Sequence, residues 1–283
     1  GGALERFGFV CIENHGIDPG LHAKGYALAE QLFALPIAVK QSYETPRDGR
    51  QRGYTALGVE HAKNTTLPDI KEFWQIGRDL GPQHPLHQNG DVPANRTPAE
   101  IAGFEPLFAS LFLQTEAFAN QMLDAVGTYL QLPDRFFRDM VQDSNSVLRI
   151  LHYPALTDDV PHGAVRSAQH EDINLLTVLP ASTQTGLQLL THSGTWLDVS
   201  PPAGTLICDT GDMMQLLTGG RLPATTHRVV NPDGKDAAVA RYSMPFFLHP
   251  HPDYVLKPFG ESDERPIKAR DFLHQRLVAI GVA

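Results

Sequence analysis

The second half of the chain consists of short apolar runs separated by turn residues, and this pattern constrains the fold more than any other feature. The runs are rich in β-branched and aromatic side chains, and Gly and Pro stand between them. They cover residues 147–153, 173–179, 187–190, 196–199, 205–208, 226–230 and 238–248. Short strands with turns at such intervals are typical of sandwiches, jelly rolls and barrels. We therefore predict a mainly β core with flanking helices.

The first half of the chain is predominantly helical. Apolar residues recur at helical spacing over 19–35, and Thr97-Pro98-Ala99-Glu100 predicts the start of a long helix that ends near residue 130. Residues 70–77 alternate as a strand does, whereas 81–95 carry the Gly, Pro and Asn of a loop, either a solvated connection or the mouth of a site. These patterns predict a helical N-terminal region over residues 1–143, a β core over 144–256 and a C-terminal helix within 257–283.

Composition argues against two kinds of partner. The chain has 283 residues, a net charge of −9 and no stripe of Lys and Arg, which argues against nucleic acid. No apolar segment approaches the roughly 18 residues that span a bilayer, and no signal peptide opens the chain. Cys11 and Cys208 lie in separate apolar runs, which indicates buried thiols in a reducing compartment rather than a disulfide. We expect a cytoplasmic protein; the pattern predicts no oligomeric state.

His170-Glu171-Asp172 precedes an apolar run, and we expect this sequence to open a core strand. Residues two apart on extended backbone point to the same face, so an imidazole and a carboxylate would lie side by side. The same His-x-Asp pattern recurs at His251, between prolines and after the last long strand. Position therefore favours His170 and Asp172 as metal ligands.

His227 is the best third ligand because it lies in a β-branched run that predicts a strand. His192 is its competitor, but Thr191-His192-Ser193-Gly194 predicts a turn. Two histidines and one carboxylate on one face leave three positions of an octahedron open, as in non-haem Fe(II) oxygenases. A structural zinc site would instead be closed by four ligands, usually including Cys.

Arg241 and Ser243 share one face of the last long strand. A buried Arg requires an anionic partner, and no acidic residue lies nearby in the sequence. A guanidinium and a hydroxyl would hold the distal carboxylate of a dicarboxylic acid by charge-assisted hydrogen bonds. The other end of a 2-oxo acid could then chelate the metal.

In that order, His170-x-Asp172, His227 and Arg241-x-Ser243 resemble the 2-oxoglutarate- and Fe(II)-dependent oxygenases, and more closely the isopenicillin N synthase-like branch. The resemblance covers nearly the whole chain. Supporting stretches are Gly8-Phe9, Asn14-His15-Gly16, Arg52-Gly53-Tyr54, Asp69-Ile70-Lys71-Glu72, Arg149, Tyr153-Pro154, Gly186-Leu187-Gln188 and Gly211-Asp212-Met213-Met214-Gln215.

The resemblance implies a double-stranded β-helix core of the jelly-roll, cupin-like type. It implies Fe(II) bound by the two histidines and the aspartate, and O₂ as the oxidant. It also implies that Arg241 and Ser243 bind the C5 carboxylate of 2-oxoglutarate, with Tyr153 as a further contact. Leu151 and Asp209 stand where the family commonly has Asn. We expect that Leu151 removes one contact to the cosubstrate. We expect that neither departure affects the metal ligands.

The implied activity is oxidation of an unactivated C–H bond of a small metabolite, by hydroxylation, desaturation or cyclisation, with release of succinate and CO₂. Two alternatives remain open. One is an oxidase of the same fold that needs no 2-oxoglutarate and takes all four electrons from its substrate. The other is a cupin-like metal-binding protein without turnover. Candidate substrate-pocket walls, each equally compatible with ordinary core, are Tyr54, Phe73, Trp74 and Phe246.

Overall fold

The computed structural model describes residues 1–63, 67–157, 160–191, 193–202, 204–260, 263 and 265–282. The helices are α1 (Gly2–Phe7), α2 (Pro19–Phe33), α3 (Ile37–Gln41), α4 (Pro85–Gln88), α5 (Phe104–Tyr129), α6 (Phe136–Met140), α7 (Asp212–Leu217) and α8 (Ala269–Ala279), with 3₁₀ turns at Pro46–Asp48 and Gly234–Ala238. The strands are β1 (Phe9–Ile12), β2 (Gly53–Thr55), β3 (Glu72–Gly77), β4 (Val147–Tyr153), β5 (Ser167–His170), β6 (Leu176–Pro180), β7 (Leu187–Leu190), β8 (Trp196–Asp198), β9 (Leu206–Thr210), β10 (His227–Val229), β11 (Arg241–Ser243), β12 (Phe246–Leu248), β13 (Val255–Leu256) and β14 (Ile267–Lys268).

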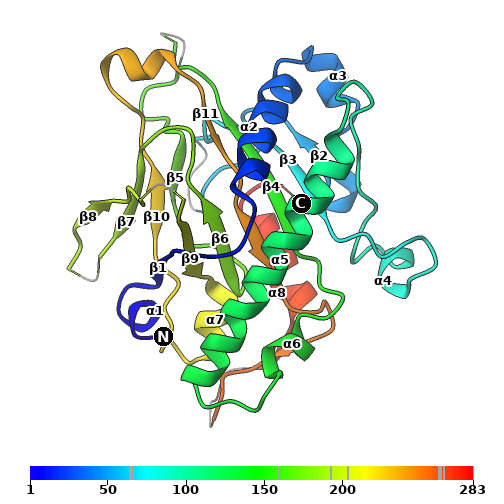
Figure 1. Ribbon diagram of the computed structural model, residues 1–283, viewed down its shortest axis with the longest axis vertical. Coiled ribbons are helices and arrows are strands. Elements are labelled where there is room, and N and C mark those ends of the chain that lie inside the picture. Colours follow the sequence, from blue (N-terminus) through cyan, green and yellow to red (C-terminus); the bar gives the residue numbers. More distant parts are fainter. Residues whose placement is uncertain are drawn as a thin grey trace.

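Two antiparallel sheets form the centre of the molecule (Figure 1). The larger sheet has the order β1-β9-β6-β12-β4-β3-β2, with β11 also paired to β4, and the smaller has the order β5-β10-β7-β8. Strands β13 and β14 pair separately below them. Because β1, β2 and β3 join the larger sheet, the N-terminal region and the β core share one sheet.

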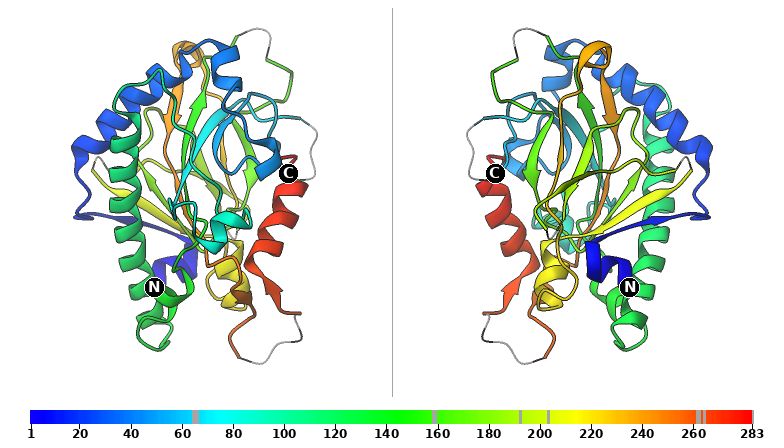
Figure 2. Two further views of the ribbon diagram at one scale, coloured as in Figure 1. Left: turned by 90° about the vertical axis from the view of Figure 1, so that its right-hand side faces the viewer. Right: turned by 90° about the vertical axis from the view of Figure 1, so that its left-hand side faces the viewer.

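Helices cover the two sides of this arrangement (Figure 2). Helices α2 and α5 pack on the outer face of the larger sheet, where Phe112 of α5 meets Phe246 with ring centroids 5.1 Å apart. Helix α8 lies on the opposite side, and its Leu273 and Leu277 line a cavity between the sheets. Among the described residues, no helix is long and apolar enough to cross a membrane.

The alternation of β4 shows how the sequence divides the two faces of the larger sheet. Leu148 and Ile150 belong to the core beneath the helices, whereas Arg149 and Leu151 line the cavity. Successive side chains of a strand point to opposite faces, so one strand serves both the core and the site. The neighbouring strands β3, β11 and β12 follow the same rule.

The helix predicted from Thr97 begins later, at Phe104. The capping box does not form, because Tyr43 donates its hydroxyl hydrogen to the Glu100 carboxylate (3.0 Å) and accepts the Ala99 N–H (3.0 Å). Gly103 then adopts a left-handed φ of 76°, which no regular helix accommodates. The predicted loop over 81–95 likewise contains the short helix α4.

Two smaller expectations also need correction. The run over 238–248 is interrupted at Pro245, which has no N–H to offer a neighbouring strand, so that β11 and β12 are separate. Cys208 is buried as expected, but Cys11 is exposed because β1 lies at the edge of the larger sheet. Both are free thiols.

Candidate metal centre and cosubstrate pocket

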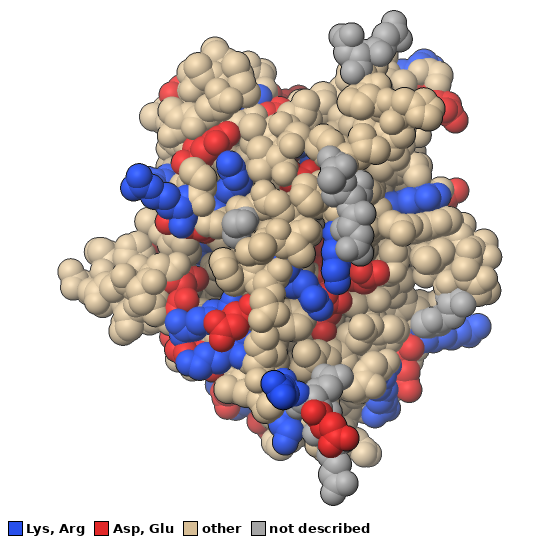
Figure 3. Space-filling model, turned by 180° about the vertical axis from the view of Figure 1, so that it is seen from behind, with Lys and Arg blue, Asp and Glu red and all other residues tan. Residues whose placement is uncertain are grey.

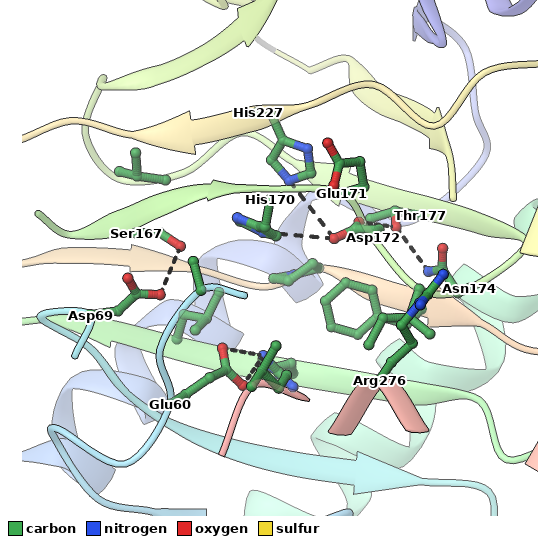
Figure 4. Close-up of a pocket in the computed structure, with 18 of the residues that line it drawn as sticks. Glu60, Asp69, Ser167, His170, Glu171, Asp172, Asn174, Thr177, His227 and Arg276 are labelled. Carbon is green, nitrogen blue, oxygen red and sulfur yellow. Dashed lines mark hydrogen bonds and ion pairs between the residues drawn. The ribbon is translucent and has the colours of Figure 1, made fainter. Parts of the chain in front are cut away.

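His170, Asp172 and His227 converge at one end of the smaller sheet (Figure 4). His170 ends β5 and His227 begins β10, and the two residues are direct partners in the antiparallel register. Their ring centroids are therefore 4.4 Å apart. The Oδ1 atom of Asp172 lies 3.9 Å from Nε2 of His170 and 3.7 Å from Nε2 of His227. One cation could contact all three atoms.

Backbone hydrogen bonds orient both imidazoles. Nδ1 of His170 lies 2.7 Å from the Ala168 carbonyl, and Nδ1 of His227 lies 3.1 Å from the Thr225 carbonyl. A carbonyl only accepts, so each Nδ1 carries the proton and each Nε2 offers its lone pair to the common point. Burial, reinforced by His227, lowers the pKa of His170 to about 4. Its imidazole is therefore neutral near pH 7, as metal binding requires.

The loop after β5 places the carboxylate, which corrects the expectation that His170 opens a strand. Asp172 lies between β5 and β6, where its carbonyl accepts the Asp212 N–H at 2.7 Å. The Asn174 side chain donates to the carbonyl of Leu176 at the start of β6 (3.2 Å). These bonds hold the loop from which the Asp172 side chain projects.

Two residues that the sequence did not single out as partners hold the Asp172 carboxylate. The Thr177 hydroxyl donates to Oδ2, the oxygen that points away from the histidines. Asp209 on β9 faces the same carboxylate, and burial together with Asp172 raises the pKa of Asp209 well above its usual range. A side-chain hydrogen bond between Asp209 and Asp172 adds to this shift, because it favours the protonated form of Asp209. The expectation that position 209 does not touch the ligand set is wrong.

Arg241 occupies the other end of the same cavity. It is 1% exposed and lies opposite Tyr153 in the β11–β4 register, with its guanidinium carbon 5.0 Å from that ring's centroid. Nη2 donates to the Ser182 hydroxyl (2.9 Å) and Nε to the Gln184 carbonyl (3.2 Å). Nη1 is buried and has no partner among the described residues. An unpaired buried donor on a cation calls for an anionic ligand.

A second buried guanidinium stands close to the first. Arg166 is fully buried and donates to the Gln184 side chain (3.1 Å) and the Val239 carbonyl (2.8 Å). Burial and the nearby Arg241 lower the pKa of Arg166. No acidic side chain in the described part of the chain forms an ion pair with either one. The sequence offered no signal for Arg166, because its proximity to Arg241 is a tertiary contact.

The cavity joining these two ends has a volume of about 470 Å³. A charged network that the sequence missed forms part of its wall. Lys71 Nζ lies 2.7 Å from carboxylate oxygens of both Glu60 and Asp69, and Arg149 Nη1 lies 3.2 Å from Glu60. Burial opposes ionisation, but Arg149 and Lys71 hold the pKa of Glu60 at about 2. This network has balanced charges.

None of the four aromatic residues considered for the substrate pocket is among the residues that line the cavity. Tyr54, Trp74 and Phe246 belong to the core beneath the helices. Phe73 is on the inner side of the sheet, where it packs under Arg149 with the guanidinium carbon 4.1 Å from its ring centroid. Of the aromatic pair at 246 and 247, only Phe247 lines the cavity.

The parity of β11 and β12 explains this outcome. Arg241, Ser243, Pro245, Phe247 and His249 are spaced by two and all line the cavity. Counting in steps of two from Arg241 would therefore have placed Phe247, not Phe246, on the cavity wall. His192, the competitor for the third ligand position, lies outside the described residues.

Two family models match the chain. Residues 1–100 match the non-haem dioxygenase N-terminal family named for morphine synthesis, and residues 144–250 match the 2OG-Fe(II) oxygenase superfamily. The 2-oxoglutarate-Fe(II) type oxidoreductase hxnY of Emericella nidulans is 30% identical over 262 residues, which cover 90% of this chain and 74% of that protein.

Solved structures give the same result. A 2OG-Fe(II) oxygenase family protein from Caulobacter crescentus aligns with a TM-score of 0.87 and 38% identity, over 98% of this chain and 92% of the other. A full-length Neurospora crassa protein, solved in complex with alpha-KG and thymine, aligns with a TM-score of 0.84 and 27% identity, over 98% of this chain and 89% of the other.

The chain belongs to the 2OG-Fe(II) oxygenase superfamily. It is a 2-oxoglutarate-dependent dioxygenase with a double-stranded β-helix core, and its cofactor and cosubstrates are Fe(II), 2-oxoglutarate and O₂. The predicted family, fold class, enzyme class and cofactors are therefore confirmed. The boundaries predicted for the three regions stay predictions, as do the roles of individual residues.

Proposed function

We propose that this dioxygenase oxidises an unactivated C–H bond of a small molecule in the cavity between its two sheets. The residues proposed to bind Fe(II) are His170, Asp172 and His227, and those proposed to bind 2-oxoglutarate are Arg241, Ser243 and Tyr153. The observation that carries the proposal is the placement of all six on the wall of one cavity, with an unpaired guanidinium nitrogen at one end.

The donor set fits Fe(II). Two imidazole nitrogens and one carboxylate oxygen lie within 4.8 Å of one another. Such a facial set leaves coordination positions for further ligands, whereas a structural zinc site would be closed. When bound, Fe(II) would activate O₂, which is the oxidant for C–H cleavage, and 2-oxoglutarate would supply two of the four electrons as it is oxidised to succinate and CO₂.

The role of the residues of the chain is to bind and orient the reacting groups. The backbone carbonyls at Ala168 and Thr225 fix the two imidazoles, and Thr177 fixes the carboxylate. Arg241 sets the depth at which a distal carboxylate binds, with a hydrogen-bond donor left free for it. Apolar side chains from both sheets and α8 line part of the cavity, and their low local dielectric strengthens the polar contacts beside them.

Several observations support a small-molecule substrate. A cavity of about 470 Å³ lies within the usual range for small ligands. Acidic and basic side chains are interspersed on the face seen from behind, where the residues drawn form no broad basic area (Figure 3). The Neurospora crassa protein was solved with thymine, and a Petromyces alliaceus relative 29% identical to this chain is named a proline hydroxylase. The absence of a nucleic-acid partner and the cytoplasmic location stay predictions.

The test is release of labelled CO₂ from 1-labelled 2-oxoglutarate during a metabolite screen with the iron-loaded enzyme. We expect a substrate-stimulated signal that His227→Ala abolishes. His251→Ala is the matched control, because His251 belongs to the second His-x-Asp sequence and its Nδ1 is occupied by the Asp253 N–H (3.1 Å). Retained turnover in His227→Ala would refute the ligand set. Oxygen uptake without labelled CO₂ would favour the oxidase.

A further inference from the structure

His249 is a buried imidazole whose Nδ1 has no hydrogen-bond partner in the described part of the chain, and the proposed chemistry does not use it. The residue is 7% exposed and follows β12. Its Nδ1 is fully buried and has no hydrogen-bond partner among the described residues. A buried polar group without a partner is costly, so it calls for a ligand that completes it.

The ring lies where a substrate could reach it. His249 lines the active-site cavity together with Arg241, Ser243 and Phe247, whose spacing by two places them on one face. It also lines a second hollow of about 420 Å³, which shares Gln51, Leu273 and Leu277 with the first. His249 therefore stands in the partition between two cavities.

We propose that His249 is a substrate-binding residue that selects substrates with an uncharged hydrogen-bonding group, such as an amide or a lactam. The inference rests on the proposed function, because it assigns the polar anchor for the substrate of that same site. A neutral imidazole donates from one ring nitrogen and accepts at the other, so an amide can pair with either nitrogen, through its carbonyl or through its N–H.

The charge state of His249 favours an uncharged partner. Burial lowers the pKa of His249 to about 4, with Arg149 and Arg52 adding to the shift and Asp172 opposing it. The imidazole is therefore neutral near pH 7 and cannot neutralise a carboxylate. A neutral imidazole can still form ordinary hydrogen bonds to an uncharged group such as an amide.

The cations of the cavity wall are also committed elsewhere. Lys71 and Arg149 share the carboxylates of the charged network, and Arg276 pairs with Asp212 at 3.0 Å. Arg241 is assigned to the distal carboxylate of the cosubstrate. Lys63 also lines the wall but is exposed. Within the described residues, the buried part of the cavity therefore has no spare cation for a second carboxylate.

The experiment compares His249→Leu, which has a similar volume but no polar atom, with His249→Gln, which keeps a donor and an acceptor. The control is His274→Leu, because His274 lines the second hollow but not the active-site cavity. The protein is loaded with Zn(II) and 2-oxoglutarate to prevent turnover. The probes are matched pairs of amide and acid, benzamide with benzoate and indole-3-acetamide with indole-3-acetate, titrated by ligand-observed NMR.

We expect wild type to bind the amide of each pair more tightly than the acid. His249→Leu should weaken amide binding roughly tenfold, and His249→Gln should retain most of it. The thermal midpoint of the ligand-free protein should rise by roughly 2–6 °C in His249→Leu, because an unsatisfied buried group is removed. A merely structural histidine would give a fall instead.

A lowered midpoint in His249→Leu, or wild type that does not prefer the amides, would overturn the inference. The same titration with 2-oxoglutarate on the metal-loaded variants separates this result from failure of the proposed function. If the metal-loaded wild type fails to bind 2-oxoglutarate, the proposed function fails; if all variants bind it equally, only the role of His249 is under test.

Discussion

Arg241→Met is the substitution for which the structure gives the sharpest prediction. It replaces a guanidinium by an unbranched apolar side chain, and thereby removes the only unpaired nitrogen of Arg241, Nη1, together with the charge. Truncating one partner of a buried, hydrogen-bonded charge pair costs about 2–5 kcal/mol. That range corresponds to an increase of roughly 30- to 4,000-fold in the Kd for 2-oxoglutarate. Arg166 remains nearby as a second cation, so we expect the lower part of the range.

The assay is anaerobic calorimetric titration of 2-oxoglutarate into the protein loaded with Mn(II). Arg138→Met is the matched control, because Arg138 pairs with Asp124 on the surface. The stability of the ligand-free protein should not fall in Arg241→Met, since the substitution removes a buried charge without an acidic partner. A change in Kd of less than about fivefold, with metal binding intact, would refute the assignment of Arg241 to the cosubstrate.

Two further predictions concern the surroundings of Asp172. Thr177→Val removes the hydroxyl that fixes the Asp172 carboxylate, and metal affinity measured by competition with a chelator should fall roughly 10- to 100-fold; an unchanged affinity would show that the hydrogen bond is dispensable. Asp209→Asn keeps a donor toward Asp172 and removes an acid whose pKa is raised by folding. Stability tied to that raised pKa is fully present below the unfolded value of 3.8 and is lost as the pH rises. The metal-free Asn variant should therefore gain stability over wild type in urea denaturation at neutral pH, and the gain should vanish near pH 4. A gain independent of pH would contradict a protonated Asp209.

The residues proposed to bind the metal and the cosubstrate could be singled out in the sequence because their chemistry is visible over short distances. His170-x-Asp172 and Arg241-x-Ser243 each hold their functional groups two residues apart, and His227 lies in a strand of its own. Even so, the local reason was partly wrong. Asp172 lies in the loop between β5 and β6 and not in a strand, so the sequence predicted the grouping of these three residues from an incorrect secondary structure.

The residues that were missed act through contacts between distant segments. Thr177 and Asp209 meet Asp172 because β6 pairs with β9, and Arg166 meets Arg241 across the fold. The aromatic walls failed for another reason. Neighbours such as Phe73 and Trp74 face opposite sides of β3, and a run of apolar residues does not reveal which parity faces a ligand. On β11 and β12, the position of Arg241 indicates which alternate residues face the cavity, because its charged group must lie on that side.

The placement of the site on both sheets links the cosubstrate to the fold itself. The two histidines belong to the smaller sheet, whereas Arg241 belongs to the larger one. A ligand that touches both the metal and Arg241 therefore bridges the sheets, and its binding energy opposes their separation. Without metal, the same ligand would hold only the larger sheet through its carboxylate. If the proposed residues bind these groups, we expect metal and 2-oxoglutarate to bind cooperatively, because neither one alone would connect the two sheets.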